Sequence, residues 1–310
     1  MAVGNGMGIG IPMVNLGLGG GGGGGASFLL DDYPNTTGHS YSLRQLSSTV
    51  TNVVRVRRSS DNTEQDFTAT EITDGTLATF CGAGEGFVAK WYDQSNSADV
   101  LNFTALQQPK IFVEDGIGGY EVPLENGKPC IVFDGVDDSL QVLLGLPFSS
   151  IYYLFAVNTW VSPPEEGEGY MYGLRTPSPP FPSGDDLSNS ISWDGTTGTM
   201  KGAGIPQPGV TDLTFPKIGT FPQSLYYARQ AVAAIPSAGS TLKINTTQYP
   251  AIGAAANGSA QINSIHLGES GGGSLNSNIK LQEFILYFAD PGGSGATAIE
   301  SNINTHYSIY

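Results

Sequence analysis

The chain has 310 residues, of which 43 are glycine, 19 are proline and only 13% are charged. This size suits one large β domain, and frequent glycine and proline favour short strands joined by turns over long helices. The formal net charge of −15 argues against nucleic acid or an anionic membrane as a partner, because both need a basic surface. No apolar stretch approaches the roughly 18 residues of a membrane span, and the first residues lack the pattern of a signal peptide.

Residues 1–26 differ from the rest of the chain in being dominated by glycine, with an unbroken run from Gly19 to Gly25. Such a segment is flexible when isolated, because glycine loses the most conformational entropy on ordering. We infer an N-terminal anchor that becomes ordered by packing into a larger assembly; the alternative is a tail folded back on its own domain. The apolar side chains available for this packing are those of Ile9, Ile11, Met13, Val14, Leu16 and Leu18.

Residues 27–310 are predicted to form one β-rich domain. Within Ser40–Ser47, Leu43 and Leu46 are three residues apart, a spacing that indicates one or two helical turns. Valines and arginines then alternate over 53–58, as in a strand with one polar face. Further strands are expected at Phe87–Tyr92, Lys110–Val113, Cys130–Phe133, Leu140–Leu143, Tyr152–Asn158, Tyr170–Leu174, Ser190–Trp193, Leu225–Ala231, Thr241–Ile244, Ile262–Leu267 and Ile279–Phe288. Strands at intervals of roughly 10 to 20 residues are typical of a β-sandwich.

The later part of the chain contains one long predicted loop and a helical end. Residues 162–186 are rich in proline and acidic residues and are expected to form a surface loop. Gly292–Gly295 is expected to be a turn. Ile299 and Ile303 are four residues apart, which indicates a short helix over Ala298–His306 with one apolar stripe against the sandwich.

The cysteines and histidines indicate no metal site. Cys81 and Cys130 could form one disulfide, but two small buried hydrophobic residues are favoured, because a chain of this size needs no covalent staple. Two cysteines and three scattered histidines cannot form a spaced zinc motif. No metal or cofactor is therefore predicted. The histidines are His39, His266 and His306.

The acidic residues offer no catalytic pair that spacing alone can select. Hydrolysis of a glycosidic bond needs two carboxylates about 5 to 10 Å apart, and among 28 acids some pair always meets that distance. We therefore predict no catalytic residue. Asp134, Asp137 and Asp138 could bind calcium through their carboxylates, although an ordinary acidic turn is favoured.

The basic residues Arg55, Arg57 and Arg58 lie close in sequence to Glu64 and Asp66. Ion pairs across a β-hairpin are favoured over a site for a bound anion. The group is therefore expected to be structural.

The segment W-Y-D-Q-S contains the only candidate binding residues, Trp91, Tyr92 and Asp93. In a functional interpretation, an aromatic ring stacks on a sugar beside a carboxylate that contacts its hydroxyl groups. In the alternative, which we favour, Trp91 lies in the core and Asp93 caps a turn by accepting backbone N–H groups.

Several stretches together resemble a known family. They are S-Y-S-L-R-Q-L-S-S, V-R-V-R-R-S-S-D-N-T-E-Q-D-F, F-C-G-A-G-E-G-F-V-A-K-W-Y-D-Q-S, Q-P-K-I, N-G-K-P-C-I-V-F-D-G-V-D-D-S-L and the closing E-F-I-L-Y with I-E-S-N-I-N-T-H-Y. The chain resembles, over most of residues 28–310, the concanavalin A-like, laminin-G-like jelly roll, in particular the domain shared by fungal arabinofuranosidase B modules and tailed-phage structural proteins. The glycine-rich start resembles short N-termini of phage virion proteins.

The resemblance implies an all-β jelly-roll sandwich with short peripheral helices behind a glycine-rich tail. It also implies a non-enzymatic virion protein on the exterior of a phage particle, as a capsid decoration, head fibre or tail fibre component. The anchor would then bind other virion proteins, the chain would form a trimer, and the sandwich would bind host or environmental glycans. Two alternatives remain: an arabinofuranosidase-like glycoside hydrolase and a purely architectural capsid cement protein.

Overall fold

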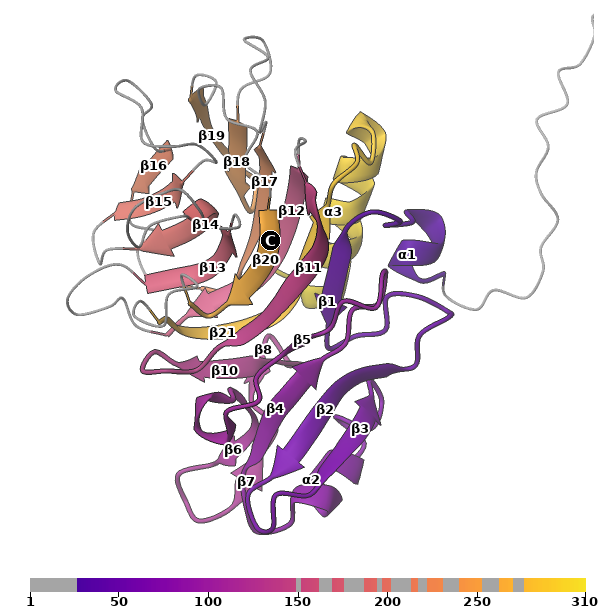
Figure 1. The fold of residues 1–310 in the computed structure, drawn as a ribbon, viewed down its shortest axis with the longest axis vertical. Helices are drawn as coiled ribbons and strands as arrows, with labels where there is room; N and C mark the ends of the chain where they lie inside the picture. Colours follow the sequence, from indigo (N-terminus) through magenta and orange to yellow (C-terminus); the bar gives the residue numbers. More distant parts are fainter. Residues whose placement is uncertain are drawn as a thin grey trace, which may run out of the picture.

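The computed structural model describes residues 27–148, 152–161, 169–175, 187–193, 197–201, 213–216, 222–230, 240–252, 262–269 and 276–310. Within these ranges antiparallel strands form two layers, with short helices at the periphery (Figure 1). The fold is therefore the all-β sandwich that the sequence predicts. No helix in these ranges is long and apolar enough to cross a membrane. The predicted anchor at residues 1–26 lies outside them, so the domain division and the trimer stay predictions.

The first layer is a continuous hydrogen-bonded run of strands. In spatial order they are β3 (Glu64–Thr68), β2 (Asn52–Arg58), β4 (Gly86–Trp91), β5 (Val100–Leu101), β11 (Leu140–Phe148), β20 (Ile262–Leu267), β13 (Gly169–Arg175), β14 (Leu187–Trp193), β15 (Thr197–Lys201) and β16 (Leu213–Pro216). Strands β13 to β16 follow one another in sequence, whereas the pairings of β5 with β11 and of β20 with both β11 and β13 join separate parts of the chain.

The second layer is organised around the long strand β21 (Asn278–Tyr287). On one side of β21 lie β12 (Tyr152–Trp160), β17 (Ser224–Gln230), β18 (Ser240–Ile244) and β19 (Thr247–Ile252). On its other side lie β1 (His39–Ser42) and β10 (Ile131–Asp134), and β10 continues to β6 (Lys110–Glu114) and β7 (Tyr120–Glu121). Because β6 also pairs with β4, the two layers join at that strand. A separate hairpin contains β8 (Leu124–Glu125) and β9 (Lys128–Pro129).

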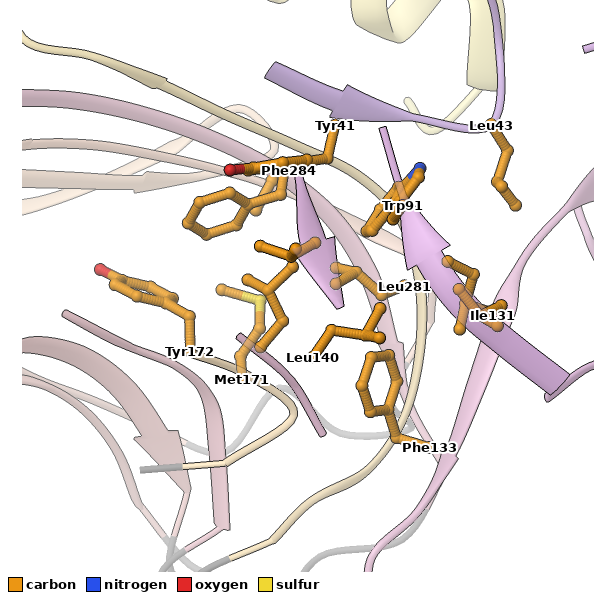
Figure 2. Close-up of a cluster of buried hydrophobic side chains, with 14 of the residues drawn as sticks. Tyr41, Leu43, Trp91, Ile131, Phe133, Leu140, Met171, Tyr172, Leu281 and Phe284 are labelled. Carbon is orange, nitrogen blue, oxygen red and sulfur yellow. The ribbon is translucent and has the colours of Figure 1, made fainter. Parts of the chain in front are cut away.

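The main hydrophobic core lies between the two layers. Tyr41 packs against both Trp91 and Phe284, with ring centroids 6.0 and 6.4 Å apart, and Tyr172 of the first layer packs against Phe284 at 5.4 Å. Figure 2 shows these rings in one cluster with Leu140 and Leu281. Such aromatic contacts contribute large buried areas to the sandwich. The core therefore draws on strands from both ends of the described chain.

A second apolar cluster covers the outer face of the β21 layer. It is formed with α1 (Leu29–Asp32) and α3 (Gly293–Tyr307), whose Ile299 and Ile303 are fully buried. Every residue of β12 is buried, because one face of this strand packs into the main core and the other beneath the helices. The remaining helices, α2 (Thr76–Cys81) and the 3-10 turn η1 (Ala105–Gln107), lie at the edge. Neither α1 nor α3, which both pack on the β21 layer, covers the outer face of the first layer.

Most of the predicted strands are confirmed, while two local predictions are wrong. Residues 39–42 form β1 instead of helical turns, because this segment extends along the edge of β21 and satisfies its backbone groups there. Leu43 and Leu46, whose spacing indicated a helix, belong to different clusters on opposite faces of the layer. The turn expected at Gly292–Gly295 is also wrong, since α3 already begins at Gly293.

Cys81 and Cys130 are both free and buried, which confirms the favoured interpretation of the cysteines. Burial raises the pKa of the Cys81 thiol to about 11 and that of Cys130 to about 12. Both thiols therefore stay protonated and behave as small apolar groups at neutral pH. The predicted loop at 162–186 is interrupted by β13, and its other residues lie outside the described part of the chain.

Gly268 at the end of β20 is expected to be intolerant of substitution. Its φ is +80°, and a Cβ atom added there would lie 2.2 Å from the buried ring of Phe133. Gly268→Ala should therefore lower the free energy of unfolding by about 1–3 kcal/mol, measured by urea denaturation. Gly116→Ala is the matched control, since its φ is also +80° but its added Cβ meets nothing within 4 Å. Equal losses for both variants would contradict a steric role for Phe133.

Candidate active site

The structure places the candidate residues of the W-Y-D-Q-S segment in the framework of the fold. Trp91 is fully buried in the main core, so its ring has no face exposed for stacking on a ligand. Tyr92 is half-buried, and its hydroxyl donates a hydrogen bond to Asp66 over 2.8 Å. Burial, together with that carboxylate, raises the pKa of Tyr92 to about 12. The Trp91 ring therefore belongs to the core, and a binding role for the half-buried Tyr92 stays a prediction.

Asp93 is the centre of a buried turn. Its carboxylate accepts hydrogen bonds from the backbone N–H groups of Ser40, Ser95 and Ala98 at 2.9, 3.0 and 3.2 Å. It also lies 2.8 Å from Nδ1 of His39. Burial opposes ionisation, but these contacts, first among them that with His39, hold the pKa of Asp93 below its ordinary range. Asp93 therefore links β1 to the turn after β4 through these hydrogen bonds.

The arginine group is structural, as expected, although its pairs differ in detail. Arg55 and Asp66 form an ion pair across the β2–β3 hairpin, with 2.6 Å between Nε and Oδ1. Arg57 instead donates a hydrogen bond over 2.7 Å to Gln108. Arg58 pairs with Asp61 in the turn, over 2.7 Å. Each guanidinium group thus has a partner within the protein, which favours a structural role over binding of an anion.

The acidic turn between β10 and β11, defined by Asp134, Asp137 and Asp138, brings three carboxylates together. One oxygen from each lies within 4.8 Å of the others. Asp134 Oδ1 accepts the backbone N–H of Val136 over 2.8 Å, and Asp138 Oδ2 accepts the backbone N–H of Asp134 over 3.0 Å. The turn residues thus hold one another in place while two of the carboxylates face solvent.

The environments of these carboxylates differ strongly. Asp138 is only 4% exposed, whereas Asp134 is exposed and Asp137 is half-buried. Burial, assisted by the negative charges of Asp134 and Asp137, raises the pKa of Asp138 to about 7. Asp138 can therefore keep its proton near neutral pH while a neighbouring carboxylate is ionised. General acid catalysis with a second, ionised carboxylate requires such a pair.

Contacts from a distant strand fix the shape of the acidic turn. Gly135 has a φ of +79°, and a Cβ atom there would meet the backbone nitrogen of Asn278 at 2.9 Å. The side-chain amide of Asn276 donates a hydrogen bond to the carbonyl oxygen of Val136. The residues at the start of β21 and just before it therefore position the turn. The Val136 side chain at the tip of the turn is 73% exposed.

The same three carboxylates are the group of described residues that could hold a metal ion. Calcium prefers 6 to 8 oxygen ligands, so it would need further oxygens from the backbone or from water. The prediction that no metal is bound stays a prediction.

Sequence reasoning identified the acidic turn but missed the role of Asp138. The pKa of its carboxyl group is raised mainly by burial, and no local sequence pattern reveals such burial. The sequence also gave no reason to connect His266 with a chemical site. In the structure, His266 lies between Ser264 and Glu269 at hydrogen-bonding distances.

Comparisons with known proteins identify structural neighbours only. No family model and no curated protein matches the chain. An arabinofuranosidase complexed with arabinofuranosyl-α-1,2-xylobiose matches with a TM-score of 0.63 and 13% identity, over 89% of this chain and 64% of that one. A mutant GH54 α-L-arabinofuranosidase soaked with 4-nitrophenyl α-L-arabinofuranoside matches with a TM-score of 0.64 and 14% identity, over the same shares. The chain thus spans about 64% of the length of these enzymes.

A Trypanosoma rangeli sialidase in complex with sialic acid also matches, over 70% of this chain and 31% of that one, with 14% identity. Its TM-score of 0.49 is too low to support an argument about this chain. The arabinofuranosidase matches establish the shared sandwich fold, since identities of 13 and 14% show fold alone.

These matches correct the functional prediction. The two matched structures are arabinofuranosidases and neither is a phage protein, so the prediction of a phage virion component without enzymatic activity is corrected, and the hydrolase alternative is favoured. The error has a physical source, because the motifs that carried the resemblance are structural. Trp91 lies in the core, Asp93 caps a turn, and Gln94 donates to the backbone carbonyls of Ser42 and Arg44. Such residues indicate a fold without distinguishing the proteins that use it.

Proposed function

We propose that the chain is a glycoside hydrolase that acts on α-arabinofuranosides. The observation that carries this proposal is the pairing of Asp138, whose pKa is raised to about 7, with the exposed carboxylate of Asp134. The sandwich shared with two arabinofuranosidases supports the choice of substrate. As part of the same proposal, the domain is assigned to the concanavalin A-like jelly-roll type.

The two carboxyl groups have different roles in the proposed reaction. Asp138 donates its proton to the oxygen of the departing alcohol, which makes cleavage of the glycosidic bond easier. Asp134 attacks the anomeric carbon from the opposite face and forms a covalent glycosyl intermediate, which water then hydrolyses with Asp138 as the base. A separation within 4.8 Å suits this two-step mechanism, because an inverting enzyme needs more room for a water molecule.

The proposal is tested by turnover of 4-nitrophenyl α-L-arabinofuranoside. The unaltered chain is expected to release nitrophenol, and Asp134→Asn and Asp138→Asn should each lower kcat by at least about 100-fold, because each removes one catalytic group. Asp115→Asn is the matched control. Asp115 also caps a turn, accepting the N–H of Ile117 over 2.9 Å, but it belongs to the β6–β7 hairpin. This variant should retain full activity.

The stereochemical outcome provides a second readout. Proton NMR of the first-formed sugar should show retention of the anomeric configuration. Binding of arabinosides without turnover would overturn the proposal and leave the sandwich as a carbohydrate-binding scaffold. Turnover that survives both Asp134→Asn and Asp138→Asn would instead place the catalytic residues elsewhere.

A further inference from the structure

A compact group of three polar side chains lies on the outward face of β20. Ile265 and Leu267 of this strand point into the main core, so the alternating Ser264 and His266 point to the opposite face. Glu269 follows directly after the strand and returns to the same face. This is also the face of the first layer that α1 and α3 leave uncovered.

The three side chains form a linear chain of hydrogen bonds. Ser264 Oγ lies 3.1 Å from His266 Nε2, and His266 Nδ1 lies 3.1 Å from Glu269 Oε1. An ionised carboxylate can only accept, so Nδ1 must carry the imidazole proton and Nε2 is left to accept from the serine hydroxyl. A hydroxyl, a base and a carboxylate that orients the base are the parts of an activated serine nucleophile.

The three side chains of this group are buried, and their neighbours on the adjacent strands differ in size. Ser264, His266 and Glu269 are 3, 7 and 6% exposed, respectively, so their hydrogen bonds are shielded from competing water. On the adjacent strand β11, Leu143 lies opposite Ser264 and is 81% exposed. On the other side, Gly173 of β13 lies opposite His266 and adds no side chain beside the ring. The strand beside the serine thus presents an exposed apolar side chain, Leu143, on the same face as the three polar groups.

We propose that Ser264, His266 and Glu269 form a nucleophilic site that hydrolyses carboxylic esters of small acyl groups. In the first step, Ser264 Oγ bonds to the carbonyl carbon while His266 Nε2 takes the hydroxyl proton and the carbonyl electrons move to oxygen. The intermediate then collapses, and the alcohol leaves with the proton from His266. Water repeats the same steps on the acyl-serine, which releases the carboxylic acid and restores the serine hydroxyl.

Covalent labelling tests the nucleophile directly. The purified full chain is incubated with a fluorophosphonate, and intact mass with peptide mapping is expected to show one adduct, on Ser264. Hydrolysis of p-nitrophenyl acetate should also be detectable, and Ser264→Ala should lower its kcat/KM by at least about 100-fold and abolish the adduct. Ser301→Ala, at an exposed position of α3, is the control and should change neither readout.

The outcomes separate this proposal from the glycosidase. Ser264→Ala should leave arabinofuranoside turnover unchanged, because the glycosidase reaction is assigned to the acidic turn. An unaltered chain that acquires no adduct, or an adduct that persists in Ser264→Ala, would overturn the ester-hydrolase site. If Ser264→Ala fails to fold by thermal unfolding, the mapped position of the adduct in the unaltered chain decides the question.

Glu269 is a positioning residue in this arrangement, and its role has its own readout. Glu269→Gln should lower kcat for the ester by about 100-fold or more with little change in KM, since it disturbs the orientation of the base without touching the substrate. Glu269→Asp should recover part of the loss because it keeps the carboxylate. Equal losses for both variants would indicate a purely structural residue.

Discussion

Replacement of Glu283 by alanine is expected to lower the free energy of unfolding by about 3–5 kcal/mol. The Glu283 side chain is completely buried in β21 and forms a two-pronged ion pair with Arg44, at 2.7 and 3.0 Å. It also accepts hydrogen bonds from the hydroxyl groups of Ser42 and Tyr307, at 2.7 and 3.3 Å. Removing the carboxylate leaves the mostly buried guanidinium of Arg44 without its charge partner, which is far more costly than losing an exposed pair.

Urea denaturation measures this loss, with Glu85→Ala as the matched control. Glu85 also forms an ion pair, with Lys110 over 2.7 Å, but both side chains are about one-third exposed. The control should cost no more than about 1 kcal/mol. A combined Arg44→Met and Glu283→Leu variant should be more stable than Glu283→Ala alone, since no charge is then left unpaired. Similar losses for Glu283→Ala and Glu85→Ala would contradict the importance assigned to burial.

Asp138 is expected to make the stability of the chain fall as the pH rises. Its pKa is raised from 3.8 to about 7 in the folded state, mainly by burial. Between these values the folded chain retains a proton that the unfolded chain has released. The stabilisation is therefore complete below the unfolded pKa and decreases by up to about 4 kcal/mol as the pH rises through 7.

Asp138→Asn should remove this dependence. Asparagine cannot lose a proton, yet its side-chain oxygen can still accept the backbone N–H of Asp134. Relative to the unaltered chain, the variant should gain about 3 kcal/mol in unfolding free energy between about pH 5 and pH 8, measured by urea denaturation. Asp115→Asn provides the control for ordinary turn acids, because backbone hydrogen bonds lower the pKa of Asp115 instead. A difference that does not change with pH would show that Asp138 titrates normally.

The sequence predicts the fold best where the apolar pattern is strong. The apolar run within Tyr152–Asn158 predicts a strand, which the structure extends to Trp160, and Ile299 with Ile303 predicts a helix with one apolar stripe on the sandwich. Two strands were not predicted, because their apolar pattern is weak. Thr197–Lys201 contains one large apolar residue, Met200, and Leu213–Pro216 is only four residues long, but both are strands because they pair in order beyond β14.

The candidate sites were harder to predict, because they depend on tertiary contacts. The pKa of Asp138 is raised mainly by its burial in the folded chain, and the neighbouring aspartates alone resemble an ordinary turn. Ser264 and His266 are two residues apart, so strand alternation could have placed them on one face. Nothing in the sequence, however, showed that Glu269 returns towards the imidazole ring. The family motifs were most misleading for function, since Trp91 and Asp93 are part of the scaffold.

The central position of β21 has a consequence for biosynthesis. This strand contacts β1, β10 and β12, so three earlier segments acquire their shared neighbour only after residue 287 has left the ribosome. Until then, the emerging polypeptide exposes unpaired strand edges that could associate with other chains. Pairings between such distant segments are also slow to form. Cells that make this protein therefore face their greatest risk of aggregation during translation, before the final strand is inserted.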